Sequence, residues 1–481
     1  SMVVSWCCLL PTVFNRKLKY KQSSAAPVGL QSFCRSETGL TMKTVIRKQQ
    51  GYVVDLPYSF SFYQEMQPLW LVSAAGFMGL QAPKLTEPFR YCELGCGLAV
   101  NLLVAAALYP QGHFVGVDFN AEQLELARRG AEAAGLSNIE LVHADFASFA
   151  AQQHQPFDFM VCHGTWSWIS PQNQQQILRT VQQHLNSGAL FYLHYMCQPG
   201  SERMRPVQQL IKQVDCSLPG QSSAQSIEQA KHLLRQLNQA GVFSHQPGMT
   251  EHLAALCERD ANYLAHEFLT DYWLPEHSAD LHQRVAQAGL SYLCSANLFD
   301  NLDALSVPAE VQPILATVRD PALRETLKDL ARNQQQRQDL YQVLPKPLSP
   351  ALQLSTVQAM QFQLLPHAPE AGALRFQTPI GEIPAPEALF LPLLTRLQQG
   401  KTSFKDLQQL PVFQNQTAVL LQALQMLIWA KYLHPVLPFQ HSDLQQQQQL
   451  ATWFRQQGIA LQLIPQCGTA IHFPLTTEFT S

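Results

Sequence analysis

The chain has 481 residues, of which 46% are hydrophobic and 14% are charged, and its formal net charge is −3 at neutral pH. This length exceeds that of one compact domain and predicts two or three. The slightly negative charge excludes a protein that binds nucleic acid by broad phosphate neutralisation, so we expect no nucleic-acid partner. Because no apolar run reaches the roughly 18 residues that cross a bilayer, we predict a soluble, cytoplasmic protein without a membrane span.

The eleven cysteines form no CxxC pair and no Cys/His cluster of the zinc-finger type. Several of them, such as Cys92 and Cys162, fall inside expected strands. We interpret them as reduced core thiols, which are typical of cytosolic proteins, and we predict no metal site.

Residues 1–41 differ from the rest of the chain. The apolar stretch from Met2 to Leu10 precedes a basic cluster from Arg16 to Lys21, which reverses the order of a secretory signal. We expect a disordered or non-native extension upstream of a start at Met42. A short organelle-targeting or membrane-surface segment is the alternative.

An aromatic segment from Met42 to Glu87 comes next, and we expect it to cover the sheet or, through Tyr58 and Tyr63, to line a pocket. Strands and helices then alternate, which predicts an α/β fold with a doubly wound, mostly parallel Rossmann-like sheet. The expected strands span residues 89–94, 112–117, 139–142, 157–162 and 189–193, and the expected helices span residues 101–108, 121–134 and 171 to about 185. Asn120 and Gln123 are expected to form a capping box, Gly135 to end that helix, and Gly188 to turn the chain into its fifth strand.

Beyond Pro199 the pattern is mainly helical, and the strand pattern returns at residues 289–298 and 339–344. We therefore predict a catalytic domain at 42–200, a helical insertion at 201–288, completion of the sheet at 289–345 and a mainly helical C-terminal domain at 351–481. The expected helices in these regions span residues 227–240, 249–258, 281–288, 388–398, 403–408 and 417–431.

The candidate site begins at the turn Tyr91–Gly97, where an apolar strand ends in Glu93 and two glycines lead into a helix. The dinucleotide fingerprint G-x-G-x-x-G is absent because Val100 stands at its third glycine. Two further strands end in Asp118 and Asp145, so acidic groups gather at one edge of the sheet. Such a set repels phosphate and attracts a cationic sulfonium nucleoside, with Asp118 accepting from the ribose hydroxyls and Asp145 from the adenine amino group. We therefore predict S-adenosylmethionine as cofactor, with candidate contacts at Glu93, Gly95, Gly97, Asn101, Asp118, Phe119, Asp145, Phe146 and His163.

The Glu-Leu-Gly-Cys-Gly turn and the Val-Asp-Phe end of the second strand resemble the class I S-adenosylmethionine-dependent methyltransferases. The chain is also similar to bacterial protein lysine methyltransferases in three motifs, Pro57-Tyr58, His163–Trp168 and Tyr263–Glu267. That resemblance covers about Gly51 to Pro438 and implies a helical methyltransferase regulatory domain and a winged-helix-like C-terminal domain. The chain departs from the family where Ala99 and Val100 replace a glycine and where Trp166 replaces a tyrosine.

The resemblance implies methyl transfer to lysine side chains of a protein substrate. Tyr58, Tyr63, Trp166 and Trp168 would desolvate the lysine amine and His163 could serve as its base, so these five are the candidate catalytic residues. We interpret His266 and Glu267 as packing or capping groups of the insertion. A small-molecule methyltransferase with the insertion as a lid, and a non-catalytic protein that binds cofactor or a partner, remain alternatives, and a homodimer is left open.

Overall fold

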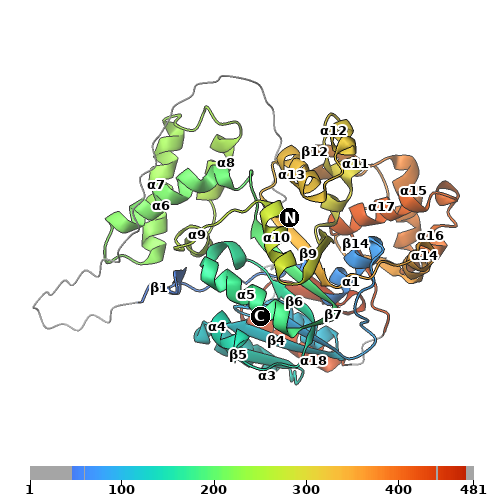
Figure 1. Ribbon diagram of the computed structural model, residues 1–481, viewed down its shortest axis with the longest axis horizontal. Coiled ribbons are helices and arrows are strands. Elements are labelled where there is room, and N and C mark those ends of the chain that lie inside the picture. Colours follow the sequence, from blue (N-terminus) through green and yellow to red (C-terminus); the bar gives the residue numbers. More distant parts are fainter. Residues whose placement is uncertain (1–45, 59, 440–442, 473–481) are drawn as a thin grey trace, which may run out of the picture.

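A seven-stranded sheet forms the centre of the protein, with strand order β5-β4-β3-β6-β7-β9-β8 (Figure 1). The computed structural model describes residues 46–58, 60–439 and 443–472, so the extension expected at 1–41 lies outside the described residues. Strands β3 to β7 run parallel, and β9 is antiparallel to both β7 and β8. The bounds are β3 Phe89–Leu94, β4 Gly112–Asp118, β5 Ile139–His143, β6 Phe157–Cys162, β7 Leu185–Met196, β8 Leu290–Ser295 and β9 Gln336–Val343. The predicted doubly wound sheet is confirmed.

The start of β7 differs from the prediction. Gly188 was expected to turn the chain into the strand, but β7 already begins at Leu185, and Gly188 lies within it at a φ of 82°. The pairing of β6 with β7 shifts at this point, which is the behaviour of a β-bulge. A glycine with positive φ inside a strand marks such a bulge as readily as a turn, so the sequence alone did not separate the two.

Helices cover both faces of the sheet, and α3 among them is capped as the sequence predicts. The Asn120 side chain accepts from the backbone N–H groups of Glu122 and Gln123, and Gly135 follows the helix at a φ of 63°. The reciprocal half of the expected capping box is not formed, because the Gln123 side chain instead lies at the cavity described below. The helices of this part are α1 Pro68–Phe77, α2 Val100–Leu108, α3 Ala121–Ala133, α4 Phe146–Ala150 and α5 Pro171–His184.

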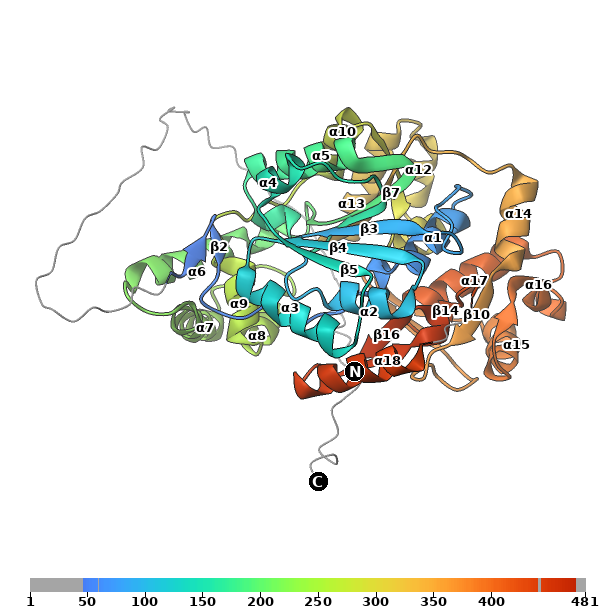
Figure 2. The same ribbon diagram turned by 90° about the horizontal axis from the view of Figure 1, so that it is seen from below.

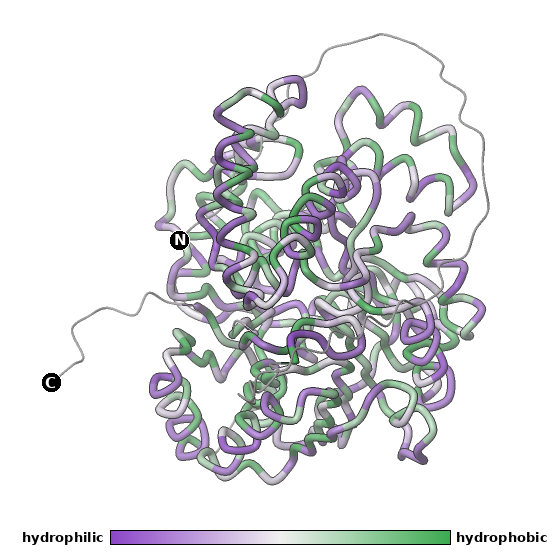
Figure 3. The backbone as a smooth tube through the Cα atoms, turned by 90° about the vertical axis from the view of Figure 1, so that its left-hand side faces the viewer, coloured by the Kyte–Doolittle hydropathy of each residue, from purple (hydrophilic) through white to green (hydrophobic). Residues whose placement is uncertain are grey.

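Between β7 and β8 the chain leaves the sheet as a helical insertion with its own apolar core, seen on the left of Figure 1. Its helices are α6 Arg205–Ser217, α7 Ser223–Gln239, α8 Met249–Cys257 and α9 Ala261–Phe268. Helix α10 Ser278–Gln287, which was expected in the insertion, instead packs against β8 and α13. Between β8 and β9 lie α11 Asp303–Ser306, α12 Gln312–Thr317 and α13 Pro321–Arg332. Hydrophilic and hydrophobic residues alternate along the helical parts of the tube in Figure 3, as they do in amphipathic helices packed on a core.

A buried ionic cluster holds the antiparallel edge of the sheet to α13. The Arg337 guanidinium donates to Asp339 at 3.0 Å, to Asp329 at 2.6 Å and to Glu325 at 2.8 Å. The Arg337 charge lowers the pKa of both Asp339 and Glu325 to about 2, against the opposing effect of burial. Arg337, Asp339 and Glu325 therefore stay ionised at neutral pH, and the cluster fixes β9 to the helix that precedes it.

The C-terminal region is mainly helical, as predicted, and it packs against α1, α2 and α3. It contains α14 Pro350–Ala359, α15 Glu387–Gln398, α16 Phe404–Leu407, α17 Thr417–Trp429 and α18 Leu444–Gln456, with the strands β10 Gln361–Leu364, β11 Arg375–Thr378, β12 Gly381–Pro384, β13 Thr402–Ser403, β14 Leu433–Pro435, β15 Leu461–Ile464 and β16 Thr469–His472. Helix α18 lies along α2 and α3 (Figure 2). The winged-helix character of this region stays a prediction.

Two further features bear on the expectations from composition. The described cysteines are all free, and all of them except Cys216 are buried, as the prediction of core thiols requires. Among the helices of the described residues, none combines the length and the apolar character that crossing a membrane requires.

Candidate active site

The turn between β3 and α2 is fixed by backbone hydrogen bonds to β4. The N–H groups of Gly95 and Cys96 donate to the Val117 carbonyl at 2.8 and 3.0 Å, and the Gly97 N–H donates to the Asp118 carboxylate at 2.8 Å. Gly95 has a φ of 79°, and a Cβ there would collide with the Thr165 side chain. Glycine is therefore required where the sequence predicted it, and the turn leaves its concave side open.

Two carboxylates lie side by side at this turn. Burial and the neighbouring Asp118 charge raise the pKa of Glu93 to about 8. One oxygen of Glu93, Oε2, is buried without a hydrogen-bond partner among the described residues. Burial also raises the pKa of Asp118, although the N–H groups of Asn120 and Gly97 that donate to it act in the opposite direction. This pair is poorly neutralised by the protein itself and suits a cationic ligand.

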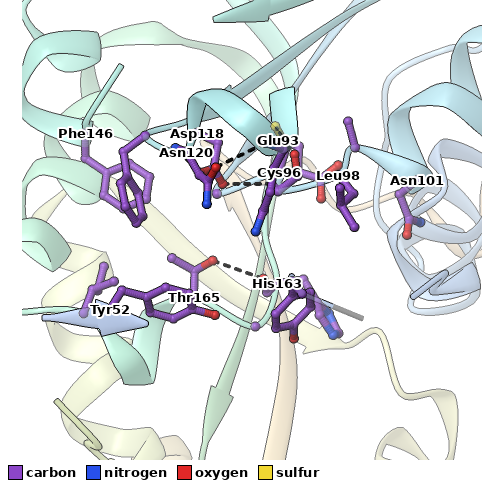
Figure 4. A pocket seen from close by; sticks show the side chains of 18 of the residues that line it. Tyr52, Glu93, Cys96, Leu98, Asn101, Asp118, Asn120, Phe146, His163 and Thr165 are labelled. Atoms are coloured by element: carbon purple, nitrogen blue, oxygen red, sulfur yellow. Dashed lines mark hydrogen bonds between the residues drawn. The ribbon is translucent and has the colours of Figure 1, made fainter. Parts of the chain in front are cut away.

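A cavity opens in front of the turn. In Figure 4 Glu93, Asp118 and Asn120 lie on one side of it, while Tyr52, Thr165 and His163 face them from the other. The structure brings all nine predicted cofactor contacts to the lining of this cavity, together with Tyr58 and Tyr63 from the aromatic segment. Within the described residues, no group of three or more His, Cys, Asp or Glu side chains is placed to hold a metal ion.

The far end of the cavity combines aromatic rings with one more carboxylate. Phe119 and Phe146 line it, and the Tyr52 ring meets the Phe119 ring edge-on with centroids 6.3 Å apart. Asp145 is the N-cap of α4 and accepts from the Ser148 N–H at 2.7 Å, which holds the pKa of Asp145 below its usual value. Apolar rings around an ionised hydrogen-bond acceptor match the requirements of an adenine base.

Asn101 lines the cavity, but its amide is already engaged. Its Nδ2 donates to the Tyr63 carbonyl at 2.7 Å, and its Oδ1 accepts from the Tyr63 N–H at 3.1 Å. Because both ends of the amide are bound by one backbone residue, Asn101 positions the aromatic segment over the site. The direct cofactor contact of Asn101 that the sequence suggested stays a prediction.

His163 is the centre of a stack of rings on the near side of the cavity. The Tyr63 and His194 rings lie on it with centroids 3.8 and 4.2 Å away, and its Nδ1 is 2.8 Å from the Tyr192 hydroxyl. Burial, with a contribution from His194, puts the pKa of His163 well below its usual value, so the ring is neutral at pH 7. His163 therefore presents a flat, uncharged wall to the cavity.

The two tryptophans expected in the acceptor pocket are placed elsewhere. Trp166 is fully buried in the apolar core behind β6, where its Nε1 donates to Glu276 at 2.8 Å and the Arg284 guanidinium lies over its ring. Trp168 donates from Nε1 to the Glu267 carbonyl at 3.1 Å and packs in the core of the insertion. Neither residue lines the cavity. Each joins the turn η2 (Trp166–Trp168) to the helical insertion, because a large ring gains most by full burial when its N–H finds an acceptor.

Sequence reasoning missed several residues at the site. Tyr52, Gln123 and Thr165 line the cavity, and His194 supports His163 from behind. Gln123 had been assigned to a helix cap. Tyr52 was one aromatic residue among several. The only sequence signal for it was the glycine before it, since Gly51 forms a tight turn at a φ of 82°.

Comparison with known proteins agrees with this geometry. A family model described as a methyltransferase domain matches residues 85–241, and one described as a predicted methyltransferase regulatory domain matches residues 260–342. An uncharacterized protein of Synechocystis sp. is 31% identical over 81% of this chain and 77% of its own. The chain belongs to the class I S-adenosylmethionine-dependent methyltransferases.

The solved structures of PKMT2 from Rickettsia typhi show the same fold. One superposes with a TM-score of 0.66 at 19% identity and covers 87% of each chain. The other, in complex with AdoHcy, gives a TM-score of 0.64 at 20% identity and covers 80% of this chain and 78% of that one. A second relative, an uncharacterized protein of Rickettsia prowazekii, is 26% identical over 60% of this chain and 51% of its own.

The residues of the methyltransferase cavity fit S-adenosylmethionine. The unpartnered Glu93 oxygen and the Asp118 carboxylate provide anionic acceptors, and the glycine turn leaves space for a close backbone approach. When bound, the cofactor supplies an electrophilic methyl group on a sulfonium.

Ala99 has a backbone conformation that favours glycine, at the place where related methyltransferases carry one. It precedes α2 in the left-handed region, at φ 52° and ψ 28°, where an L-residue is strained by roughly 1–2 kcal/mol. In Ala99→Gly, relief of that strain offsets the lost methyl burial and the added chain entropy, so unfolding by urea should shift by less than about 0.5 kcal/mol. Ala105→Gly, equally buried but in regular helix, should cost more than about 1 kcal/mol. Equal losses in the two variants would contradict the assignment of strain.

The raised pKa of Glu93 predicts pH-dependent cofactor binding. A cationic ligand favours the ionised carboxylate, so below pH 8 binding has to expel a proton, and affinity should rise up to about tenfold per pH unit toward pH 8. Isothermal titration with S-adenosylmethionine between pH 6.5 and 8.5 measures this. Glu93→Gln is the control, because the amino group of the ligand titrates in the same way with both proteins. The dissociation constant of Glu93→Gln divided by that of wild type should therefore grow with pH. Parallel curves would show that Glu93 does not face the cofactor.

Proposed function

We propose that this methyltransferase transfers a methyl group from S-adenosylmethionine to the side-chain amines of lysines in a protein substrate. One observation carries the proposal. The part of the cavity next to the cofactor turn is walled by Tyr58, Tyr63 and neutral His163, without a lysine, an arginine or a charged histidine among its described lining residues. Aromatic faces of this kind hold an ammonium group and strip it of water.

The roles of the chain's residues in this proposal follow from their positions. Asp118 and Asp145 orient the ribose and adenine, while Glu93 faces the cationic end of the cofactor. Tyr63 is fixed by Asn101 from one side and by the His163 ring from the other, which holds the acceptor wall rigid. Such rigidity matters because methyl transfer depends on aligning the nitrogen lone pair with the methyl carbon.

Resemblance to bacterial protein lysine methyltransferases adds support. The motifs Pro57-Tyr58 and His163–Trp168 belong to that resemblance, and in this fold they supply Tyr58 and His163 to the cavity. The fold shared with PKMT2 is consistent with it.

The proposal is tested with labelled S-adenosylmethionine. The protein is incubated with a bacterial lysate separated by size, and the labelled products are hydrolysed in acid. We expect label in the protein fraction, recovered as methyl-lysine. Label confined to low-mass products would show a small-molecule methyltransferase instead, and recovery as methyl-arginine or as acid-labile ester would contradict the choice of lysine.

A further inference from the structure

A short β-hairpin stands between the helical insertion and the cofactor cavity. Strand β1 (Lys48–Gln49) pairs antiparallel with β2 (Tyr52–Val53), and the two turn residues, Gln50 and Gly51, have positive φ angles of 52° and 82°. Two positive φ angles in succession are characteristic of the tight type I′ turn. Gln50 in the turn and Tyr52 just after it both line the cavity.

The backbone of this hairpin is attached to the insertion. The Asp271 N–H donates to the Gly51 carbonyl at 2.7 Å, and the Lys48 ammonium pairs with the Asp271 carboxylate at 2.9 Å. A Cβ on Gly51 would lie 3.1 Å from the Asp271 Cβ, so glycine permits the close approach as well as the positive φ. Beyond β2, the Asp55 carboxylate accepts from the Ser223 N–H at 2.9 Å, at the start of α7.

Side-chain contacts join the hairpin to the elements of the large sheet. The Tyr52 ring meets the Phe119 ring edge-on, and Gln50 Oε1 lies 3.5 Å from Asn173 Nδ2. Among the described residues, β1 and β2 pair only with each other, and no backbone hydrogen bond connects them to the seven-stranded sheet. Because a two-stranded hairpin is marginally stable on its own, its position depends on the insertion and on what the cavity holds.

Tyr52 is the point at which the insertion and the cavity meet. Its ring contacts the Phe119 ring after β4 and the His266 ring on α9, with centroid distances of 6.3 and 5.4 Å. In Figure 4 Tyr52 lies across from Phe146, and β2 lies beside α9 in Figure 2. Since Phe119 and Phe146 line the end of the cavity that suits adenine, Tyr52 closes that end from the side of the insertion.

We propose that the hairpin β1–β2 is a lid on the adenosine end of the cofactor, that Tyr52 covers the base, and that the insertion holds the lid closed through Asp271. Each turnover exchanges S-adenosylhomocysteine for S-adenosylmethionine, so a lid at this position controls the rate of exchange. The inference concerns the cofactor and does not depend on which acceptor is methylated.

The contacts of the hairpin suit a lid that opens and closes. Adenine presents a flat π-face, and removing the aromatic ring on which a base stacks lowers affinity by about fivefold or more. On the side of the insertion, Lys48 and Asp271 are partly exposed, so their ion pair is weak, and the backbone hydrogen bond from Asp271 to Gly51 accompanies it. Opening therefore breaks few contacts, whereas a bound adenosine adds the contact with Tyr52 that keeps the lid shut.

Dissociation of S-adenosylhomocysteine, followed by stopped flow, tests the lid. In Tyr52→Ala the dissociation rate should rise by about tenfold or more, because the ring that covers the base is absent. Tyr52→Phe is the matched control, since it keeps the ring and should stay within about twofold of wild type. Methylthioadenosine carries the adenosine without the amino-acid end, and its affinity should fall in Tyr52→Ala by a factor similar to that of S-adenosylhomocysteine. This second ligand locates the effect at the adenosine end.

Amide hydrogen exchange in the wild-type chain tests the attachment to the insertion. The Asp271 N–H exchanges when its bond to the Gly51 carbonyl opens, and a ligand under the lid opposes that opening. With S-adenosylhomocysteine at about ten times its dissociation constant, exchange in a peptide that contains Asp271 should slow by about tenfold. Tyr52→Ala should lose this slowing. Helix α8, elsewhere in the same insertion, is the internal control and should exchange at the same rate with and without ligand.

Two results would overturn the proposal. Equal dissociation rates of S-adenosylhomocysteine from wild type and Tyr52→Ala would show that Tyr52 does not cover the cofactor. Unchanged exchange around Asp271 when wild type binds S-adenosylhomocysteine would show that the insertion does not hold the lid. Both measurements use the whole chain and need no acceptor, so failure of wild type to form methyl-lysine would overturn the proposed function and leave the lid intact.

Discussion

The hydrogen bond from the Gly97 N–H to Asp118 is the contact on which the site depends. Because β3 and β4 are parallel neighbours in register, with Leu94 beside Val117, both strands deliver their acidic ends to the same edge of the sheet. Asp118 then fixes the glycine turn that follows β3 and lies beside Glu93. The same geometry thus makes the space for a nucleoside and concentrates the negative charge that attracts a sulfonium.

A second constraint joins the insertion to this site. The turn η2 buries two tryptophan rings on opposite sides of the junction, and their N–H groups bond to Glu276 and to the Glu267 carbonyl. Any movement of α9 would break these contacts and would shift the aromatic acceptor wall with it. The insertion is therefore attached to the acceptor wall through η2 and through the contact of His266 with Tyr58.

Much of the sheet and of the cofactor side could be predicted from the sequence. The strand patterns at Phe89–Leu94 and Phe157–Cys162 gave their bounds directly, because buried parallel strands are short apolar runs between turn signals. Acidic residues at successive strand ends share one edge by topology alone, so Glu93, Asp118 and Asp145 could be grouped without coordinates. The predicted winged-helix character of the C-terminal region is not tested by the fold described above.

The acceptor side could not be predicted in the same way. Whether Trp166 and Trp168 enter the cavity or the core depends on which acceptors their N–H groups meet, and these come from residues about a hundred positions away. His266 reaches Tyr52 and Tyr58 at the cavity wall only because α9 packs on a turn of the catalytic domain. Such long-range packing leaves no periodic signal in the sequence, and the same holds for the amide of Asn101, which binds the backbone of Tyr63.

The central claim is that the carboxylate-fixed turn binds a cationic nucleoside, and titration of S-adenosylmethionine into wild type and Asp118→Ala tests it most directly. We predict binding by wild type and a loss of at least about 30-fold in affinity in the variant, since two or more charge-assisted hydrogen bonds disappear. Absence of binding by wild type, or equal affinity in the two proteins, would contradict the account.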